Sequence, residues 1–165
     1  MLRVPYVFFF IFLFSTVLSF AAELPGHVPE GPPLPVHAWI GPPVSETTKE
    51  RYRELRDAGF THSFSWFPSA DRMAEALDIA EAAGVKLFVA LPELHSDPEQ
   101  VARRFKTHPA CAGYSLRDEP SSADFAALAE RAGRIQKIDP ARWCYINLFP
   151  NYATAAQLGC PTYRE

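Results

Sequence analysis

The sequence lacks a surplus of positive charge. Its 165 residues carry a formal net charge of −3, whereas a protein that binds nucleic acid through the phosphates needs a basic face. We therefore expect no nucleic-acid partner. Disorder is not expected either, because apolar residues make up 48% and charged residues only 21% of the chain, a composition that can form a packed core.

Cysteine is scarce. The chain has three cysteines, Cys111, Cys144 and Cys160, and none of them stands in a CxxC pair, so the sequence does not predict a zinc site. Cys111 and Cys144 lie near the beginnings of two successive predicted strands, where a disulfide is geometrically conceivable. Buried free thiols are the favoured alternative.

Motifs for metals and nucleotides are also missing. The sequence has no HxH or HExxH spacing, and the turn Gly41-Pro42-Pro43 after the first predicted strand is not a glycine-rich phosphate turn. We therefore predict no metal and no cofactor.

Long apolar runs are absent except near the start of the chain. Arg3 precedes the run 7–18, and Ser19-Phe20-Ala21 offers small residues for cleavage. This pattern predicts a signal peptide at 1–21 and export to the periplasm or the cell exterior, with no stable membrane anchor after cleavage. An uncleaved anchor is the alternative, but the run is short for a membrane span.

The segment 22–35 is rich in Pro and Gly and is expected to form an extended lead-in. Beyond it, the pattern of residues 36–165 predicts alternating strands and helices. The strands are expected at 36–40, 60–66, 85–91, 112–117 and 143–149. The helices are expected at 46–58, capped by Ser45, and at 69–83, 97–105 and 121–138. This order indicates an α/β fold with parallel strands and helical crossovers.

Two architectures fit this order, an open doubly wound sheet and a (β/α)8 TIM barrel. Strict alternation in the fourth strand places Tyr114 and Leu116 toward the helices, Arg117 and Glu119 toward the barrel axis, and Asp118 on the side opposite Glu119. Apolar outer residues with polar inner residues near the carboxyl ends favour the barrel. The phosphate turn expected of the open sheet is missing.

A complete barrel needs about 200 residues or more. We therefore expect an incomplete TIM barrel of about five β/α units, in which 36–165 is the N-terminal part. The chain is expected to be a truncated product or fragment, or to assemble with the missing C-terminal half of the barrel.

The stretch 113–120, Gly-Tyr-Ser-Leu-Arg-Asp-Glu-Pro, ends the fourth predicted strand in two carboxylates. It resembles the fourth-strand motif of clan A glycoside hydrolases, in which a Glu in Asn-Glu-Pro is the general acid/base and a Glu ending the seventh strand is the nucleophile. The resemblance implies that Glu119 is the acid/base. Asp118 stands where the clan has an Asn that hydrogen-bonds the neighbouring sugar hydroxyl. The nucleophile position lies outside this sequence.

The residues themselves support an acid role for Glu119. Glycoside hydrolysis needs one carboxylic acid to protonate the leaving oxygen and a second carboxylate across the sugar. Aromatic neighbours and an adjacent acid would raise the pKa of Glu119, and Arg117 would lower it. The alternative is that Asp118 and Glu119 only stabilise the start of the following helix through its dipole.

Other predicted strand ends supply candidates for substrate binding. Trp39 and Trp66 could stack on sugar rings or belong to the core. Asn147 is a candidate hydroxyl-binding group. Glu93, with His95, follows the third strand and either binds substrate or forms a solvated loop pair. His37 on the first strand is either a ligand or a hydrogen-bonded core histidine.

The leading hypothesis is an exported carbohydrate-active protein, by resemblance a glycoside hydrolase that cleaves O-glycosyl bonds of a carbohydrate substrate. Glu119 would be the acid/base, with Asp118, Arg117, Asn147, Trp39, Trp66 and Glu93 at the substrate. The chain alone is expected to be inactive. The alternatives are a non-catalytic carbohydrate-binding barrel and a metal-dependent barrel hydrolase or isomerase using His37, Glu93, His95 and Asp118.

Overall fold

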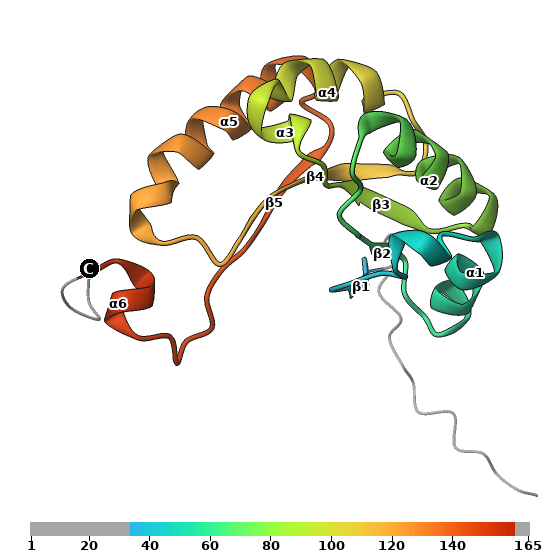
Figure 1. Ribbon diagram of the computed structural model, residues 1–165, viewed down its shortest axis with the longest axis horizontal. Coiled ribbons are helices and arrows are strands. Elements are labelled where there is room, and N and C mark those ends of the chain that lie inside the picture. Colours follow the sequence, from blue (N-terminus) through green and yellow to red (C-terminus); the bar gives the residue numbers. More distant parts are fainter. Residues whose placement is uncertain (1–33, 161–165) are drawn as a thin grey trace, which may run out of the picture. The chain divides into compact units, whose positions relative to one another are not determined.

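Five parallel strands form one curled sheet in the computed structural model, which describes residues 34–160 (Figure 1). The predicted signal peptide and nearly all of the lead-in lie outside the described residues. The five strands are β1 (His37–Ala38), β2 (His62–Ser63), β3 (Lys86–Val89), β4 (Cys111–Asp118) and β5 (Trp143–Asn147).

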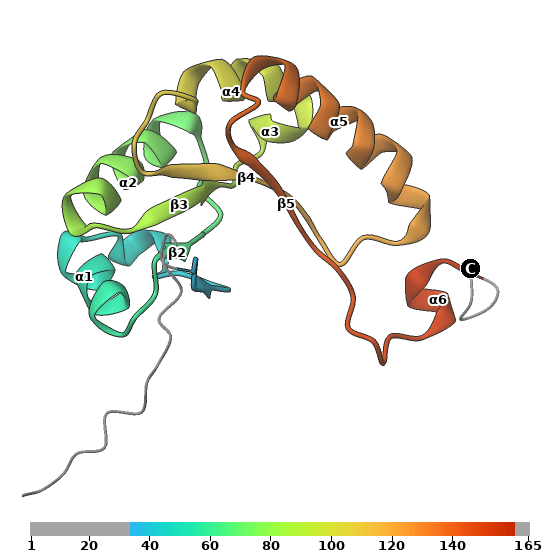
Figure 2. The ribbon, with the colours of Figure 1, turned by 180° about the vertical axis from the view of Figure 1, so that it is seen from behind.

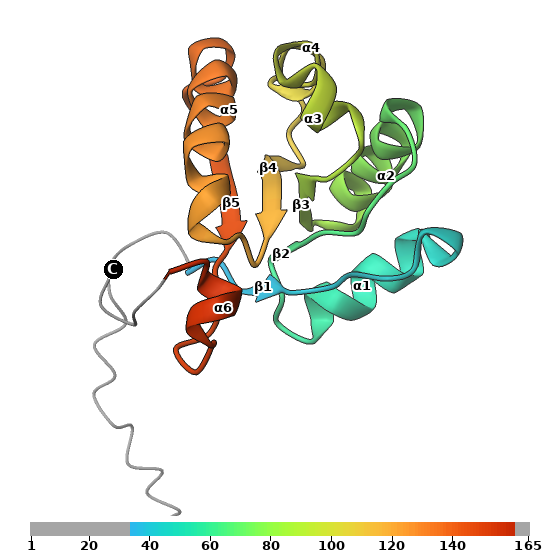
Figure 3. The ribbon, with the colours of Figure 1, turned by 60° about the vertical axis from the view of Figure 1, so that its left-hand side comes forward.

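The spatial order of the strands is β1-β2-β3-β4-β5, so each strand pairs with the next one along the chain. A doubly wound sheet would reverse direction part-way through this order. The described strands show no such reversal, and the helices that connect successive strands cover the convex side of the sheet (Figures 1 and 3). The structure therefore confirms an α/β fold with a parallel half-barrel sheet.

The crossover helices begin where the sequence predicts, with one exception. Ser69 caps α2 (Ala70–Ala83) and Asp97 caps α4 (Pro98–Phe105), each through a hydrogen bond to a first-turn N–H. The cap of α1 (Lys49–Asp57) is Thr48 rather than Ser45. The predicted Ser45 cap is wrong because Val44–Glu46 already form the 3-10 helix η1.

The last long crossover starts with the 3-10 helix η2 (Ser122–Asp124) and continues as α5 (Phe125–Ile138). Ser121 and Asp124 form a capping box, in which the Ser121 N–H donates to Asp124 Oδ2 over 2.9 Å. Two single-turn helices, α3 (Glu93–Ser96) and α6 (Ala155–Leu158), were not predicted. One turn is too short to show helical periodicity in a sequence.

The main core lies between the convex face of the sheet and the helices. Tyr114 and Leu116 of β4 are fully buried in it, as predicted, together with Tyr52, Met73 and Leu77 from the helices. Phe125, the first residue of α5, is 49% exposed.

The concave face carries a smaller apolar cluster. Phe64, Phe88, Ala90 and Ala112 are buried there, and the half-buried Tyr145 packs against them. Seen from behind in Figure 2, α1 to α5 again lie on the opposite side of the sheet, and α6 lies apart from them beyond the end of β5. The concave face is therefore where side chains near the strand ends can meet a ligand.

Cys111, Cys144 and Cys160 are free thiols. The disulfide between Cys111 and Cys144 is absent, and the alternative of free thiols is confirmed. Burial raises the pKa of both Cys111 and Cys144 to about 11, so neither is an activated nucleophile. Within residues 34–160, no helix has the length and apolar character to cross a membrane.

Candidate active site

An aromatic pocket of about 290 Å³ opens at the carboxyl ends of β1 and β2. The end of β4 contributes one acid to it. The lining residues are Trp39, Ile40, Gly41, Pro42, Pro43, Val44, Phe64, Ser65, Trp66 and Asp118. The carboxyl ends of parallel strands are where β/α proteins place their ligand sites, and three predicted site residues meet here.

The two tryptophans of this pocket are not core residues. Trp39 is 37% exposed and Trp66 is 49% exposed, so each presents ring surface to the pocket. Trp39 packs edge-on against Phe64, with ring centroids 5.1 Å apart, and Trp66 lies parallel to the His95 ring at 6.4 Å. Held in this way, both indoles can contact an apolar ligand face.

Asp118 reaches the pocket because β4 contains an irregularity. Ser115 pairs with Tyr145 of β5, but Arg117 pairs with Ile146, so Leu116 is the extra residue of a bulge. Asp118 therefore shares the side of Asn147 and Tyr145, and Arg117 shares the side of Ile146, which packs on the main core. The predicted inward direction of Arg117 and outward direction of Asp118 are both wrong, because the bulge shifts the alternation.

Asn147 orients Asp118. The Asn147 Nδ2 group donates a hydrogen bond of 2.9 Å to Asp118 Oδ1. Burial and the nearby Asp118 carboxylate raise the pKa of Tyr145. The negative charge of Asp118 therefore lies close to the aromatic cluster on the concave face. The other carboxylate oxygen of Asp118 has no hydrogen bond within the described residues.

Glu119 follows directly and has an unusual backbone. Its φ is 45°, which makes it the one non-glycine residue with positive φ in the described part of the chain. Such a conformation costs free energy and recurs at functional sites. The Glu119 N–H donates to the Asn147 carbonyl oxygen over 2.8 Å, and the exposed side chain makes no hydrogen bond or ion pair within residues 34–160.

The remaining predicted binding residues lie away from the pocket lining. Glu93 begins helix α3, and its buried Oε2 atom has no hydrogen-bond partner among the described residues. The expectation of a solvated pair of Glu93 and His95 is therefore wrong for Glu93. Burial lowers the pKa of His95, with Arg131 and Arg117 lowering it further. Roles for Arg117 and Glu93 at a substrate stay predictions.

His37 is not a hydrogen-bonded histidine. Its two ring nitrogens are buried without a partner among the described residues. The ring contacts Phe64, Phe88 and Tyr145 at centroid distances of 5.8, 5.2 and 5.3 Å. Burial lowers its pKa below the ordinary value of 6.5, so the environment disfavours the charged ring.

We expect His37→Phe to stabilise the protein by about 1 kcal/mol at neutral pH, because an apolar ring replaces unsatisfied nitrogens. The unfolded state binds the proton more readily than the folded state, so wild-type stability falls as the pH drops below about 6.5. The advantage of the variant should therefore be larger at about pH 5.5 than at about pH 7.5 in urea unfolding. An equal difference at both pH values would contradict this assignment.

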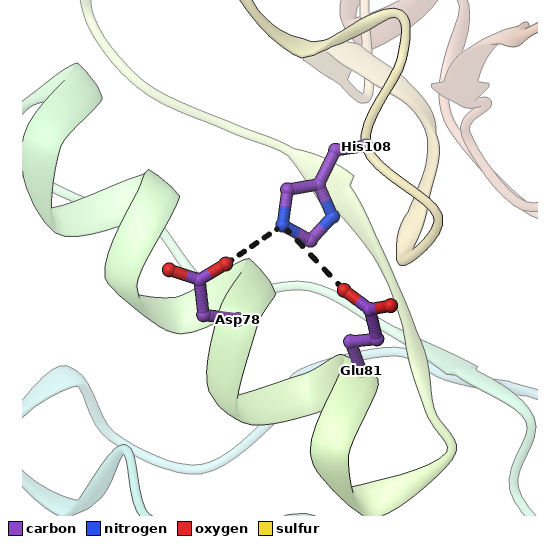
Figure 4. Close-up of side chains that lie close together, drawn as sticks. All are labelled: Asp78, Glu81 and His108. Atoms are coloured by element: carbon purple, nitrogen blue, oxygen red, sulfur yellow. Dashed lines mark hydrogen bonds and ion pairs between the residues drawn. The ribbon is translucent and has the colours of Figure 1, made fainter.

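Three side chains elsewhere lie close enough to suggest a metal site: Asp78, Glu81 and His108 (Figure 4). His108 Nε2 lies 3.1 Å from Asp78 Oδ1, and its Nδ1 accepts the Ala110 N–H over 3.2 Å. A metal-bound histidine normally donates its other ring N–H, whereas Nδ1 here faces a donor. The trio therefore holds α2 to the segment before β4. Among the described residues, His37, Glu93, His95 and Asp118 form no such group.

A second hollow of about 390 Å³ lies beside α1. Its charged residues already pair with one another, because Arg51 bridges Glu46 and Glu54 at 2.8 and 2.9 Å. It lies on the helical side of the sheet, and we do not assign it a ligand.

Sequence reasoning missed part of the pocket wall. Phe64 and Ser65 were placed in a strand without a role, and Pro42 was considered only as part of a missing phosphate turn. These residues lie at or just after the carboxyl ends of β1 and β2, where β/α proteins place their ligand-binding residues. That position in the sequence could have identified them as part of the pocket. Ser65 Oγ donates to the Pro42 carbonyl over 2.8 Å and joins the two segments.

No family model matches this sequence. No curated protein matches it either.

Proposed function

We propose that this chain belongs to an exported glycoside hydrolase that cleaves O-glycosyl bonds, with Glu119 as the general acid/base. The observation that carries the proposal is Glu119 at the end of β4: its backbone has positive φ, its exposed carboxylate has no partner within residues 34–160, and it directly follows Asp118, which lines an aromatic pocket. Strained backbone at a polar strand end is typical of functional residues. A residue that only favoured a helix start would not need this conformation.

The pocket suits a sugar ring. Trp39 and Trp66 offer flat apolar surfaces, and Asp118, which accepts a hydrogen bond from Asn147, offers a carboxylate. Glu119 would protonate the leaving oxygen of the glycosidic bond, and Asp118 would hold a neighbouring substituent of the sugar. The second carboxylate that hydrolysis requires would come from strands that complete the barrel, which would also cover the edges of β1 and β5.

An external nucleophile can stand in for that second carboxylate in a test. Azide can attack the anomeric carbon of an aryl glycoside bound to the chain, while Glu119 protonates the departing phenol. We expect Glu119→Gln to slow azidolysis of phenyl glycosides by about 100-fold, because a poor leaving group needs the proton. Dinitrophenyl glycosides should lose less than about threefold, since their leaving group departs as the anion.

Glu130→Gln is the matched control, because Glu130 is an exposed acid on α5; this variant should react like the wild type. Equal losses on both substrates would mean that Glu119 is only structural. Binding of oligosaccharide with no azidolysis of either substrate would identify a non-catalytic carbohydrate-binding protein. Either result would overturn the proposed acid role.

A further inference from the structure

The polar groups at the edge of the pocket are mainly acceptors. Asp118 is the one charged side chain in the lining, and one of its oxygens is already occupied by Asn147. The Ser65 hydroxyl donates to the Pro42 carbonyl and is also occupied. Among the described side chains of the lining, two indole N–H groups are therefore the remaining donors, and a ligand that itself donates hydrogen bonds suits the pocket.

No cationic side chain among the described residues lines this pocket. Arg117, the nearest arginine in sequence, lies on the opposite side of β4 because of the bulge. His95, behind Trp66, has a pKa lowered first by burial. The negative charge of Asp118 is thus left for a ligand, next to aromatic faces that also attract a cation.

A hydroxyl group would not need an aspartate here. A sugar hydroxyl both donates and accepts, so it can pair with either an amide or a carboxylate. An ammonium group also donates to the free oxygen of Asp118, and in addition its positive charge is attracted by the carboxylate. The negative charge at this position therefore favours an ammonium group over a neutral hydroxyl or amide.

We propose that the pocket binds a sugar unit that carries an amine in place of a hydroxyl group, and that an N–H of its ammonium form donates to the free oxygen of Asp118. Asp118 is then the specificity-determining residue, and Asn147 positions it. Because Asp118 directly precedes Glu119, the nitrogen lies on a carbon close to the reacting one. This inference rests on the proposed function and names its substrate class.

Three β-1,4-linked oligosaccharides of equal length test this inference, because they differ only at carbon 2. They are a chitosan oligosaccharide with free amines, a chitin oligosaccharide with N-acetyl groups, and a cello-oligosaccharide with hydroxyl groups. In calorimetric titration of the purified full chain, we expect the chitosan oligosaccharide to bind about tenfold more tightly than the cello-oligosaccharide. Asp118→Asn should remove this preference without weakening cello-oligosaccharide binding.

Asp57→Asn is the control for the loss of one negative charge, since Asp57 lies on α1 and pairs with Arg56. It should keep the preference. A preference for chitosan that weakens with salt supports the proposal, because salt screens the attraction between the ammonium and Asp118. A preference for chitin that does not weaken with salt would overturn it. Equal affinity for all three ligands, or a preference that survives Asp118→Asn, would overturn it and leave the sugar site standing. Binding of none would overturn both.

Discussion

Gly113→Ala should destabilise the protein by about 3 kcal/mol or more, because the new methyl group has no room. A Cβ atom built on Gly113 would lie 2.1 Å from the Trp143 carbonyl oxygen and 2.9 Å from the Trp143 nitrogen. Both contacts are with backbone, which cannot rotate away as a side chain would. The pairing of β4 with β5 must therefore open, and this pairing also aligns Asp118 with Asn147.

Urea unfolding followed by circular dichroism measures this effect. Gly133→Ala is the matched control, because Gly133 lies in α5 and a Cβ there meets nothing within 4 Å. The control should stabilise the protein by up to about 1 kcal/mol, since alanine is the better helix former. A small effect of Gly113→Ala would mean that the two strands are not paired as described.

Tyr114→Phe should lower the free energy of unfolding by about 2–3 kcal/mol, because a buried carboxylate loses its hydrogen-bond donor. The Tyr114 hydroxyl donates to Asp139 Oδ2 over 2.7 Å, and Asp139 is only 4% exposed. Burial and this hydrogen bond with Asp139 raise the pKa of Tyr114. The hydroxyl therefore stays protonated and remains the donor.

A double-mutant cycle with Asp139→Asn isolates the pair, and the two variants together should cost less than the sum of their separate costs. Tyr152→Phe is the control, because Tyr152 is 83% exposed and should leave stability unchanged. Additive costs in the cycle would show that Tyr114 and Asp139 do not depend on each other.

Much of the fold could be predicted from local patterns. Ser69 and Asp97 cap their helices because a short polar side chain satisfies a first-turn N–H wherever the chain leaves an extended segment. Tyr114 and Leu116 alternate toward the core because successive side chains of a strand point to opposite faces. These relations span a few residues, so the sequence displays them directly.

The direction of Asp118 could not be predicted in this way. Alternation placed it on the side opposite Glu119, but the bulge at Leu116 turns it toward Asn147 and the aromatic pocket. A bulge depends on how two strands pair, and residues 112–118 alone do not reveal it. The same limit hid the unsatisfied nitrogens of His37, because Phe64, Phe88 and Tyr145 come from three other segments.

The sequence by itself determined the β/α order, the helix caps and the acidic strand end at Asp118 and Glu119, because each depends on short-range periodicity or on one residue type. Only the tertiary structure decided that the strands run in sequential order and that Trp39, Trp66 and Asp118 line one pocket. It also gave Glu119 its positive φ. These features arise from contacts between segments far apart in the chain, where packing and strand pairing overrule the local pattern.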